Sequence, residues 1–268
     1  MQTGRSASLK KALGALVDLL YPPTCALCHQ RLLLNEQTLC DPCRADLLPE
    51  DTWRCLRCGA TGEGAGPEKG HVCSYCPPPG ASYQGVLAVS RYNERAARCI
   101  HLFKYQRRIE IGRLLADIMV ARLSVPLGDL EERIEWVVPV PLHWRRRAFR
   151  GFNQSDILAE RLSEHLNLPM KPEALRRVRH TKRQVRVPRE KRADNVRGAF
   201  AVDRSLSNPI PGVLLVDDVV TSGHTVGECA RVLTGAGAPQ VWVASFARGR
   251  PEERDEPEMP GEDLAGMG

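Results

Sequence analysis

Long apolar runs are missing from this sequence of 268 residues. No stretch approaches the ~20 consecutive apolar residues that a membrane-spanning helix requires, so we expect no membrane span. A leader-peptide cleavage site is missing too. No small-residue motif follows the segment SLKKALGALVDLLYPP, and Asp18 interrupts its apolar stretch. We therefore expect residues 1–24 to form a packing helix rather than a secretion signal, and the protein to be cytoplasmic.

Apolar residues are also sparse between positions 25 and 76, where Pro, Gly and polar residues fill the loops. We expect this segment to depend on metal for its fold, since it has too few apolar residues to form a core. A C-x-x-C pair places two thiolates within reach of one tetrahedral ion, and two such pairs complete a closed zinc site. Eight of the ten cysteines form four such pairs: Cys25, Cys28, Cys40, Cys43, Cys55, Cys58, Cys73 and Cys76.

The cysteine spacing predicts two structural zinc ions with no catalytic role. Sequential pairing puts the first four cysteines at one zinc and the last four at another, while an interleaved pairing stays open. Disulfides are less favoured because the chain shows no secretion signal. The two remaining cysteines, Cys99 and Cys229, lie beside alanine in helical patterns, which is typical of small buried hydrophobic residues.

Residues 211–227, PGVLLVDDVVTSGHTVG, carry the most informative pattern of the chain. The apolar run Val213 to Val216 predicts a short central parallel strand, and Asp217 and Asp218 end it. Ligands of an open α/β sheet bind where such strands end. The small polar turn that follows leads into a helix, so its backbone N–H groups converge at the positive end of that helix. The pattern predicts a phosphate cradle beside two acids.

Two acids next to a phosphate cradle suit a phosphorylated ribose, whose hydroxyls donate to the carboxylates while its 5′-phosphate lies in the turn. This stretch resembles the site for phosphoribosyl pyrophosphate (PRPP) in the type I phosphoribosyltransferases, which also bind Mg²⁺. The resemblance implies that Asp217 and Asp218 are catalytic if the protein is an enzyme. The implied PRPP-binding residues are Asp217, Asp218, Val219, Val220, Thr221, Ser222, Gly223, His224 and Thr225.

PRPP also carries a pyrophosphate, so a second anion site is needed. The segment VVPVPLHWRRRAFRGFNQSDILAERL reads as a strand, a loop of cations and a helix from about Ser155. Guanidinium groups bind phosphate oxygens in a bidentate manner; the alternative is a solvated basic loop. The candidates on the pyrophosphate side are Pro139, Val140, Pro141, Arg146, Arg147, Arg150, Gly151, Asn153 and Gln154.

Positive charge is concentrated in residues 145–197, which hold 16 Lys and Arg against 6 Asp and Glu, a net charge of +10 in a chain of net charge +6. Either this region closes over PRPP or it meets a longer polyanion such as single-stranded DNA. Aromatic residues are scarce, but Trp144, Phe149, Phe152 and Phe200 are available to stack on bases. The basic-loop and DNA candidates are Lys104, Arg145, Arg183, Gln184, Arg189, Lys191, Arg192 and Asn195.

Taken together, the four cysteine pairs and the motifs LFKYQ, VPVPLHWRRRAFRGFNQS, QVRVPREKRADNVRGAF and VLLVDDVVTSGHTV resemble the ComF family of competence proteins over nearly the whole chain. The resemblance implies a cytoplasmic role in natural transformation, with single-stranded DNA and DNA-uptake proteins as partners. It makes residues 150–154 a signature loop and matches Gln184, Arg192 and Asn195 to a basic loop. Ser222 and His224 depart from the commoner residues of the family.

The expected fold is α/β, a type I phosphoribosyltransferase-like parallel sheet flanked by helices, with a small N-terminal four-cysteine zinc-ribbon module. We expect the N-terminal helix at 1–24, the zinc-ribbon module at 25–80, the phosphoribosyltransferase-like domain at 81–250 and a disordered acidic tail at 251–268. The alternative to a DNA-handling protein is an active Mg²⁺-dependent phosphoribosyltransferase that transfers ribose 5-phosphate to a nitrogen nucleophile. No general base is evident in the sequence, which favours the DNA-handling protein over the enzyme.

Overall fold

A computed structural model describes residues 22–32, 38–48, 53–55, 57–62, 73, 76, 81–128, 130, 133–179, 181, 192–203, 205–206 and 209–249. The chain divides into two compact units, Met1–Pro49 and Glu50–Gly268. Residues 1–21 of the expected N-terminal helix and the expected tail at 251–268 lie outside the described residues. The domain boundaries expected from the sequence therefore stay predictions.

The second unit is built on a four-stranded parallel sheet in the order β3 (Gly85–Arg91), β8 (Val241–Arg248), β7 (Val213–Val220) and β4 (Trp136–Pro139). Met170 adds a parallel bridge to Val137 at the β4 edge. The two central strands are almost fully buried, as the apolar sequences VLLV and VWVASFA require for strands covered on both faces. The predicted helix-flanked parallel sheet is confirmed.

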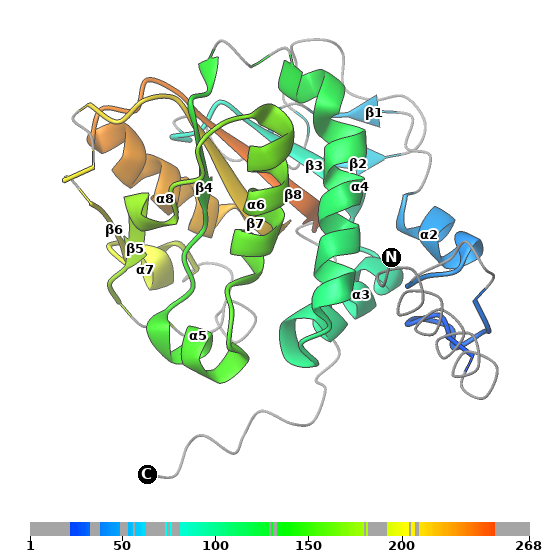
Figure 1. The fold of residues 1–268 in the computed structure, drawn as a ribbon. Helices are drawn as coiled ribbons and strands as arrows, with labels where there is room; N and C mark the ends of the chain where they lie inside the picture. Colours follow the sequence, from blue (N-terminus) through cyan, green and yellow to red (C-terminus); the bar gives the residue numbers. More distant parts are fainter. Residues whose placement is uncertain are drawn as a thin grey trace, which may run out of the picture. The chain divides into compact units, whose positions relative to one another are not determined.

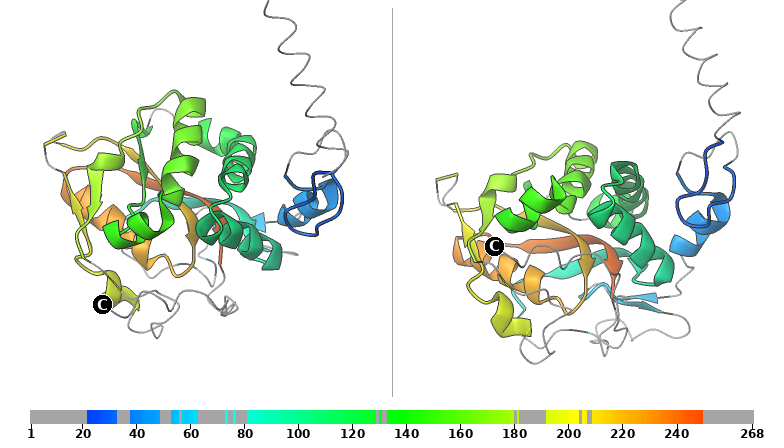
Figure 2. Two further views of the ribbon diagram at one scale, coloured as in Figure 1. Left: turned by 60° about the horizontal axis from the view of Figure 1, so that its bottom comes forward. Right: turned by 90° about the horizontal axis from the view of Figure 1, so that it is seen from below.

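Helices cover both faces of the sheet (Figures 1 and 2). On one face lie α4 (Ile109–Gly128) and α6 (Gln154–Leu166), with α3 (Glu94–Tyr105) packed against α4. On the other face lies α8 (His224–Gly235), where Val226, Cys229 and Leu233 share one apolar cluster with Val213 and Leu215 of β7. Cys99 and Cys229 are fully buried, as their alanine-flanked positions predict.

Strand β7 runs through both aspartates and ends at Val220, although the sequence predicts that it ends at Asp217 and Asp218. Asp217 is in register with Ser245 of β8, and Val220 with Arg248. Aspartate is depleted in strands, but the long neighbouring strand β8 extends the pairing past it. The acid pair therefore lies on the rigid sheet rather than in a loop.

The cationic segment after β4 is also more regular than predicted. Residues Trp144–Arg150 form helix α5 instead of a loop. His143 caps it through Nδ1, which accepts from the Arg145 N–H at 3.3 Å, and Gly151 ends it with φ of 84°. The remaining described elements of this unit are the ribbons β1 (Trp53–Arg54) with β2 (Thr61–Gly62) and β5 (Leu175–Arg177) with β6 (Phe200–Val202), the turn η2 (Pro172–Ala174) and helix α7 (Arg192–Val196).

The first unit holds a bridge between Thr24 and Arg31 and helix α2 (Asp41–Leu47). Leu27, Leu39 and Leu47 are buried in it. Within the described parts of both units, no helix has the length and apolar character needed to cross a bilayer.

Candidate functional site

The turn between β7 and α8 has the geometry of an anion cradle. Gly223 is the N-cap of α8 in the left-handed conformation, φ 78°. Glycine carries no side chain that can cap the helix, and backbone N–H groups converge at such a helix start, a common geometry for binding anions. The Ser222 hydroxyl oxygen is buried and has no hydrogen-bond partner among the described residues. Two kinds of donor thus meet at this turn.

The two carboxylates lie directly before this turn and differ in their partners. The Asp217 carboxylate accepts from the Ser155 hydroxyl at 3.2 Å and from the Asp218 N–H at 2.9 Å. Asp218 pairs with the Lys104 ammonium at 2.9 Å, with only 8% of the aspartate side chain exposed. Lys104, which the sequence suggests as a DNA contact, therefore lies at the acid pair.

Burial, and secondarily the neighbouring Asp218 carboxylate, raise the pKa of Asp217 to about 7, although Lys104 opposes the shift. A carboxyl with this pKa is half-protonated near neutral pH. Strongly perturbed carboxyl groups are enriched at functional positions. Lys104, Asp217 and Asp218 are therefore candidates for a functional site.

Three side chains of the signature loop, residues 150–154, contact other protein groups rather than solvent. The Arg150 guanidinium donates to Gln154 Oε1 at 3.0 Å and lies 4.8 Å from the centre of the Tyr105 ring. The Asn153 amide donates to the Val140 carbonyl at 3.1 Å. All of these side chains except Tyr105 are buried or nearly so. Their role in the structure is to fix the chain that follows β4, with Gly151 as the helix end.

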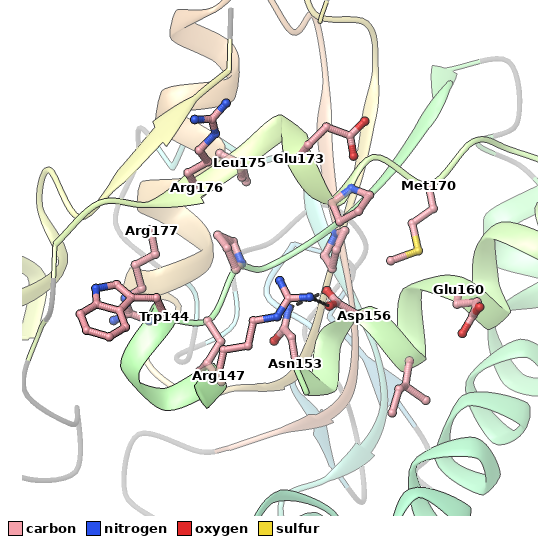
Figure 3. A pocket seen from close by; sticks show the side chains of 15 residues that line it. Trp144, Arg147, Asn153, Asp156, Glu160, Met170, Glu173, Leu175, Arg176 and Arg177 are labelled. Carbon is pink, nitrogen blue, oxygen red and sulfur yellow. Dashed lines mark hydrogen bonds and ion pairs between the residues drawn. The ribbon is translucent and has the colours of Figure 1, made fainter. Parts of the chain in front are cut away.

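Four of the pyrophosphate-side candidates line a pocket of about 560 Å³ (Figure 3), whereas Val140, Arg146 and Gly151 do not. It lies where β4 ends, between α5, α6 and residues 170–177. Arg147 reaches across it to Asp156 at 3.8 Å. Arg146 instead donates to the Thr181 carbonyl at 3.1 Å. The structure therefore gathers Pro139, Pro141, Arg147 and Asn153 at this pocket, with the acid pair on the neighbouring strand β7.

Apart from Lys104, the DNA candidates divide into one residue on α5, two residues at α7 and four residues outside the described part of the chain. Arg145 lies over the Trp144 ring, 5.2 Å from its centre, and Trp144 is 65% exposed. Asn195 accepts a hydrogen bond from Arg179 through its carbonyl at 3.0 Å. Arg192 opens helix α7. Arg183, Gln184, Arg189 and Lys191 lie outside the described residues.

Of the four aromatic residues suggested for stacking, two are exposed and two serve as packing. Phe149 is 58% exposed on the same helix as Trp144. Phe152 packs against Phe103 at 5.5 Å between ring centres, and Phe200 is buried. The Arg177 guanidinium covers Phe200 at 5.1 Å. Only α5, among the described elements, thus presents exposed aromatics together with arginines.

Sequence reasoning missed four residues near the cradle. Ser155 reaches Asp217 from the start of α6, and Arg177 is close enough to Asp217 for their charges to interact. The Tyr83 hydroxyl group packs against Gly223, and the Arg248 guanidinium donates to the Val220 carbonyl at 2.9 Å. The one signal in the sequence is Arg248, a cation at the end of an otherwise apolar strand.

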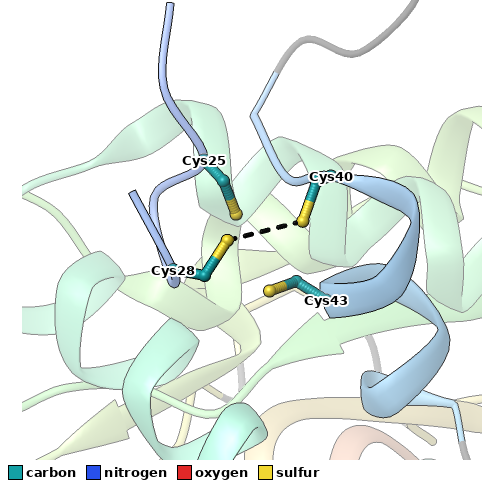
Figure 4. A group of neighbouring side chains, drawn as sticks. All are labelled: Cys25, Cys28, Cys40 and Cys43. Carbon is teal, nitrogen blue, oxygen red and sulfur yellow. Dashed lines mark hydrogen bonds between the residues drawn. The ribbon is translucent and has the colours of Figure 1, made fainter. Parts of the chain in front are cut away.

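Both four-cysteine groups are assembled, each from sequential pairs, so the sequential pairing is confirmed and the interleaved one excluded. The sulfur atoms of each group lie within 4.8 Å of one another (Figure 4 shows the first group). The Cys28–Cys40 and Cys58–Cys73 sulfurs are 3.6 and 3.3 Å apart. Tetrahedral Zn–S bonds of ~2.3 Å separate neighbouring sulfurs by about 3.8 Å, so both groups fit structural zinc.

We expect the purified protein to contain two zinc ions per chain by elemental analysis. Cys28→Ser should leave one, because three thiolates bind far more weakly than four. Cys99→Ala is the matched control, since Cys99 is a buried cysteine outside both groups, and it should retain two. A stoichiometry of one or zero in the wild type would contradict the assignment.

Comparison with known proteins agrees with this organisation. Residues 16–77 match the double zinc ribbon domain family. The chain thus combines a double zinc ribbon with a helix-flanked parallel sheet, in which the acid pair of β7 is followed by a glycine turn. The DNA utilization protein YhgH of Escherichia coli is 36% identical over 230 residues, covering 82% of this chain and 96% of that protein. Its counterpart in Salmonella typhimurium is 35% identical with the same coverage.

Competence protein F of Haemophilus influenzae is 28% identical over 226 residues, covering 84% of this chain and 96% of that protein. The chain belongs to the ComF family of competence proteins. Among solved structures, the glutamine PRPP amidotransferase of B. subtilis is 21% identical over 50% of this chain and 25% of that chain, with a TM-score of 0.34. A score this low supports no inference about activity.

Proposed function

We propose that this protein binds PRPP with Mg²⁺ at residues 217–225 and handles single-stranded DNA in natural transformation, in the cytoplasm. The observation that carries the proposal is the direct succession of two carboxylates and an uncapped helix N-terminus. Carboxylates repel phosphate, so a ligand that satisfies both needs hydroxyl groups at one end and a phosphate at the other. A ribose 5-phosphate has this shape.

The 5′-phosphate would lie against the first N–H groups of α8 and the Ser222 hydroxyl, which is buried and lacks a partner among the described residues. The ribose hydroxyls would donate to Asp217 and Asp218. The pyrophosphate would extend toward the end of β4, the strand paired with β7. Mg²⁺ prefers oxygen ligands and keeps several waters; ribose hydroxyls and pyrophosphate would hold most of it, and it would neutralise the diphosphate charge.

Calorimetric titration tests the ligand. Mg·PRPP should bind in the micromolar range typical of nucleotide-like ligands, and at least tenfold more tightly than either ribose 5-phosphate or pyrophosphate, because each of these fills part of the site. Omission of Mg²⁺ should weaken PRPP binding. Equal affinity for pyrophosphate and PRPP would show that the acid pair does not bind the ribose.

The DNA part of the proposal is supported by α5, where exposed Trp144 and Phe149 lie on either side of Arg145, Arg146 and Arg147. Single-stranded DNA is bound by aromatic platforms within basic surfaces. The helix follows β4 at the carboxyl edge of the sheet, the same edge as the PRPP cradle. The names of the relatives, DNA utilization protein and competence protein, point to the same class of partner.

We expect Trp144→Ala to weaken binding of a fluorescent oligo-dT about 5- to 100-fold at low salt, since one base–aromatic stack contributes ~1–3 kcal/mol. Val125→Ala is the control, because Val125 is 80% exposed on α4, and it should leave the affinity unchanged. Fluorescence anisotropy measures both. Equal affinities of the wild type and Trp144→Ala would remove α5 from the DNA surface.

A further inference from the structure

Arg248, the last residue of β8, is a buried cation held by carbonyl groups. Only 5% of it is exposed. Its Nε donates to the Cys58 carbonyl at 2.6 Å, and its Nη1 to the carbonyls of Val220 at 2.9 Å and Gly249 at 2.8 Å, with a further contact to the Thr221 carbonyl. The planar guanidinium offers several donors in a fixed fork, which suits one side chain that joins several segments.

The segments that Arg248 joins have different chemistry. Cys58 belongs to the second four-cysteine group, and Val220 and Thr221 open the turn that forms the anion cradle. The donor and the Cys58 acceptor are 190 positions apart in the chain. One side chain thus connects the backbone of a zinc ligand to the backbone of the cradle.

Packing around this connection leaves little room for independent movement. A Cβ built on Gly59, next to Cys58, would lie 2.9 Å from Val86 Cγ1 and 3.0 Å from the Val86 carbonyl oxygen, so the cysteine turn is seated directly on β3. A Cβ on Gly223 would lie 3.2 Å from the Tyr83 hydroxyl oxygen. Tyr83 is itself buried. The cysteine turn, the start of β3 and the cradle form one packed block.

We propose that Arg248 is a positioning residue that couples occupancy of the second zinc site to the conformation of the cradle. When Cys58 is a zinc ligand, its backbone is fixed, and Arg248 holds the carbonyls of Val220 and Thr221 against it. When the metal is lost, the Cys58 carbonyl moves and the cradle loosens. The consequence for PRPP rests on the proposed function. By linkage, PRPP then strengthens zinc binding at that site by the same factor as zinc strengthens PRPP binding.

Hydrogen–deuterium exchange of the ligand-free holoprotein tests the coupling without PRPP. Peptides that span residues 219–226 should exchange at least fivefold faster in Arg248→Met and in Cys76→Ser than in the wild type. Arg248→Lys keeps the charge but lacks the fork, and it should show an intermediate rate. The controls are Arg231→Met, an exposed arginine on α8, and Cys28→Ser in the first zinc group; neither should change these peptides.

Chelator-driven zinc release from the intact wild type provides a second readout in case the variants fold poorly. Saturating Mg·PRPP should slow release of one zinc ion at least threefold; Arg248→Lys should reduce this protection and Arg248→Met should abolish it. Unchanged exchange in Arg248→Met together with no protection by PRPP would overturn the proposal. If PRPP does not bind at all but the exchange differences appear, the proposed ligand is wrong and the coupling stands.

Discussion

Replacing both Asp217 and Asp218 by asparagine is expected to weaken Mg·PRPP binding by about 10- to 100-fold. Hydrogen bonds to a charged group contribute ~1.5–3 kcal/mol each, about twice the neutral value. The asparagine amide oxygen still accepts a neutral hydrogen bond, so each substitution removes about half of this contribution. The two together remove ~1.5–3 kcal/mol, and each 1.4 kcal/mol is tenfold in affinity. The asparagine side chains preserve shape, so the loss reports charge and not packing.

The matched control is Asp117→Asn, which neutralises an exposed carboxylate on α4 that pairs with Arg161. Its affinity for Mg·PRPP should stay within about threefold of the wild type. Asp218→Asn alone leaves the Lys104 ammonium, 17% exposed, without its ion-pair partner, so melting curves should accompany every titration. A double variant that binds PRPP as tightly as the wild type would remove the acid pair from the site.

The affinity for Mg·PRPP is expected to rise about tenfold between pH 6 and pH 8. Burial, and secondarily Asp218, raise the pKa of Asp217 to about 7. Below that pH the carboxyl is neutral and is a weaker acceptor for a ribose hydroxyl, whereas above it the carboxylate is available. PRPP itself gains charge near pH 6, as phosphate monoesters do. Asp217→Asn separates the two effects, because its affinity for Mg·PRPP should change with pH only through the titration of the ligand, and so less steeply.

The same group gives a stability prediction with a definite sign. Its pKa is about 7 in the folded protein against 3.8 for an ordinary aspartate, so the folded state binds more protons than the unfolded state between about pH 4 and 7. The free energy of unfolding of the ligand-free protein should therefore contain a contribution that falls as pH rises through this window and is constant above pH 7. Urea unfolding of the wild type minus that of Asp217→Asn isolates this contribution. A difference that rises with pH would contradict the assignment.

The sequence predicts those features that are local along the chain. The C-x-x-C spacing places two thiolates at one point whatever the fold around them, and pairing of consecutive knuckles needs only a short loop. The strand, acid pair and glycine turn are likewise contiguous, so residues 213–227 could be placed in their elements from pattern alone. Only the end of β7 differs, because pairing with β8 outweighs the low strand propensity of aspartate.

Contacts between distant segments could not be predicted. The sequence makes Lys104 a candidate DNA contact in LFKYQ, and only the packing of α3 brings it to Asp218. Arg150, Asn153 and Gln154 read as a phosphate loop, but their side chains bond to Tyr105, Val140 and one another. Arg248 donates to the carbonyl of Cys58, which lies 190 positions earlier in the chain. Charge and spacing identify such residues, but the three-dimensional fold decides their partners.

A crystal structure with Mg·PRPP tests the central claim most directly. The account predicts the 5′-phosphate at the backbone N–H groups of residues 221–225 and the ribose hydroxyls within 3.2 Å of the carboxylates of Asp217 and Asp218, a hydrogen-bond distance. Density for PRPP elsewhere, for example in the pocket between α5 and α6, would contradict it. So would an empty cradle at a ligand concentration that saturates the protein in solution.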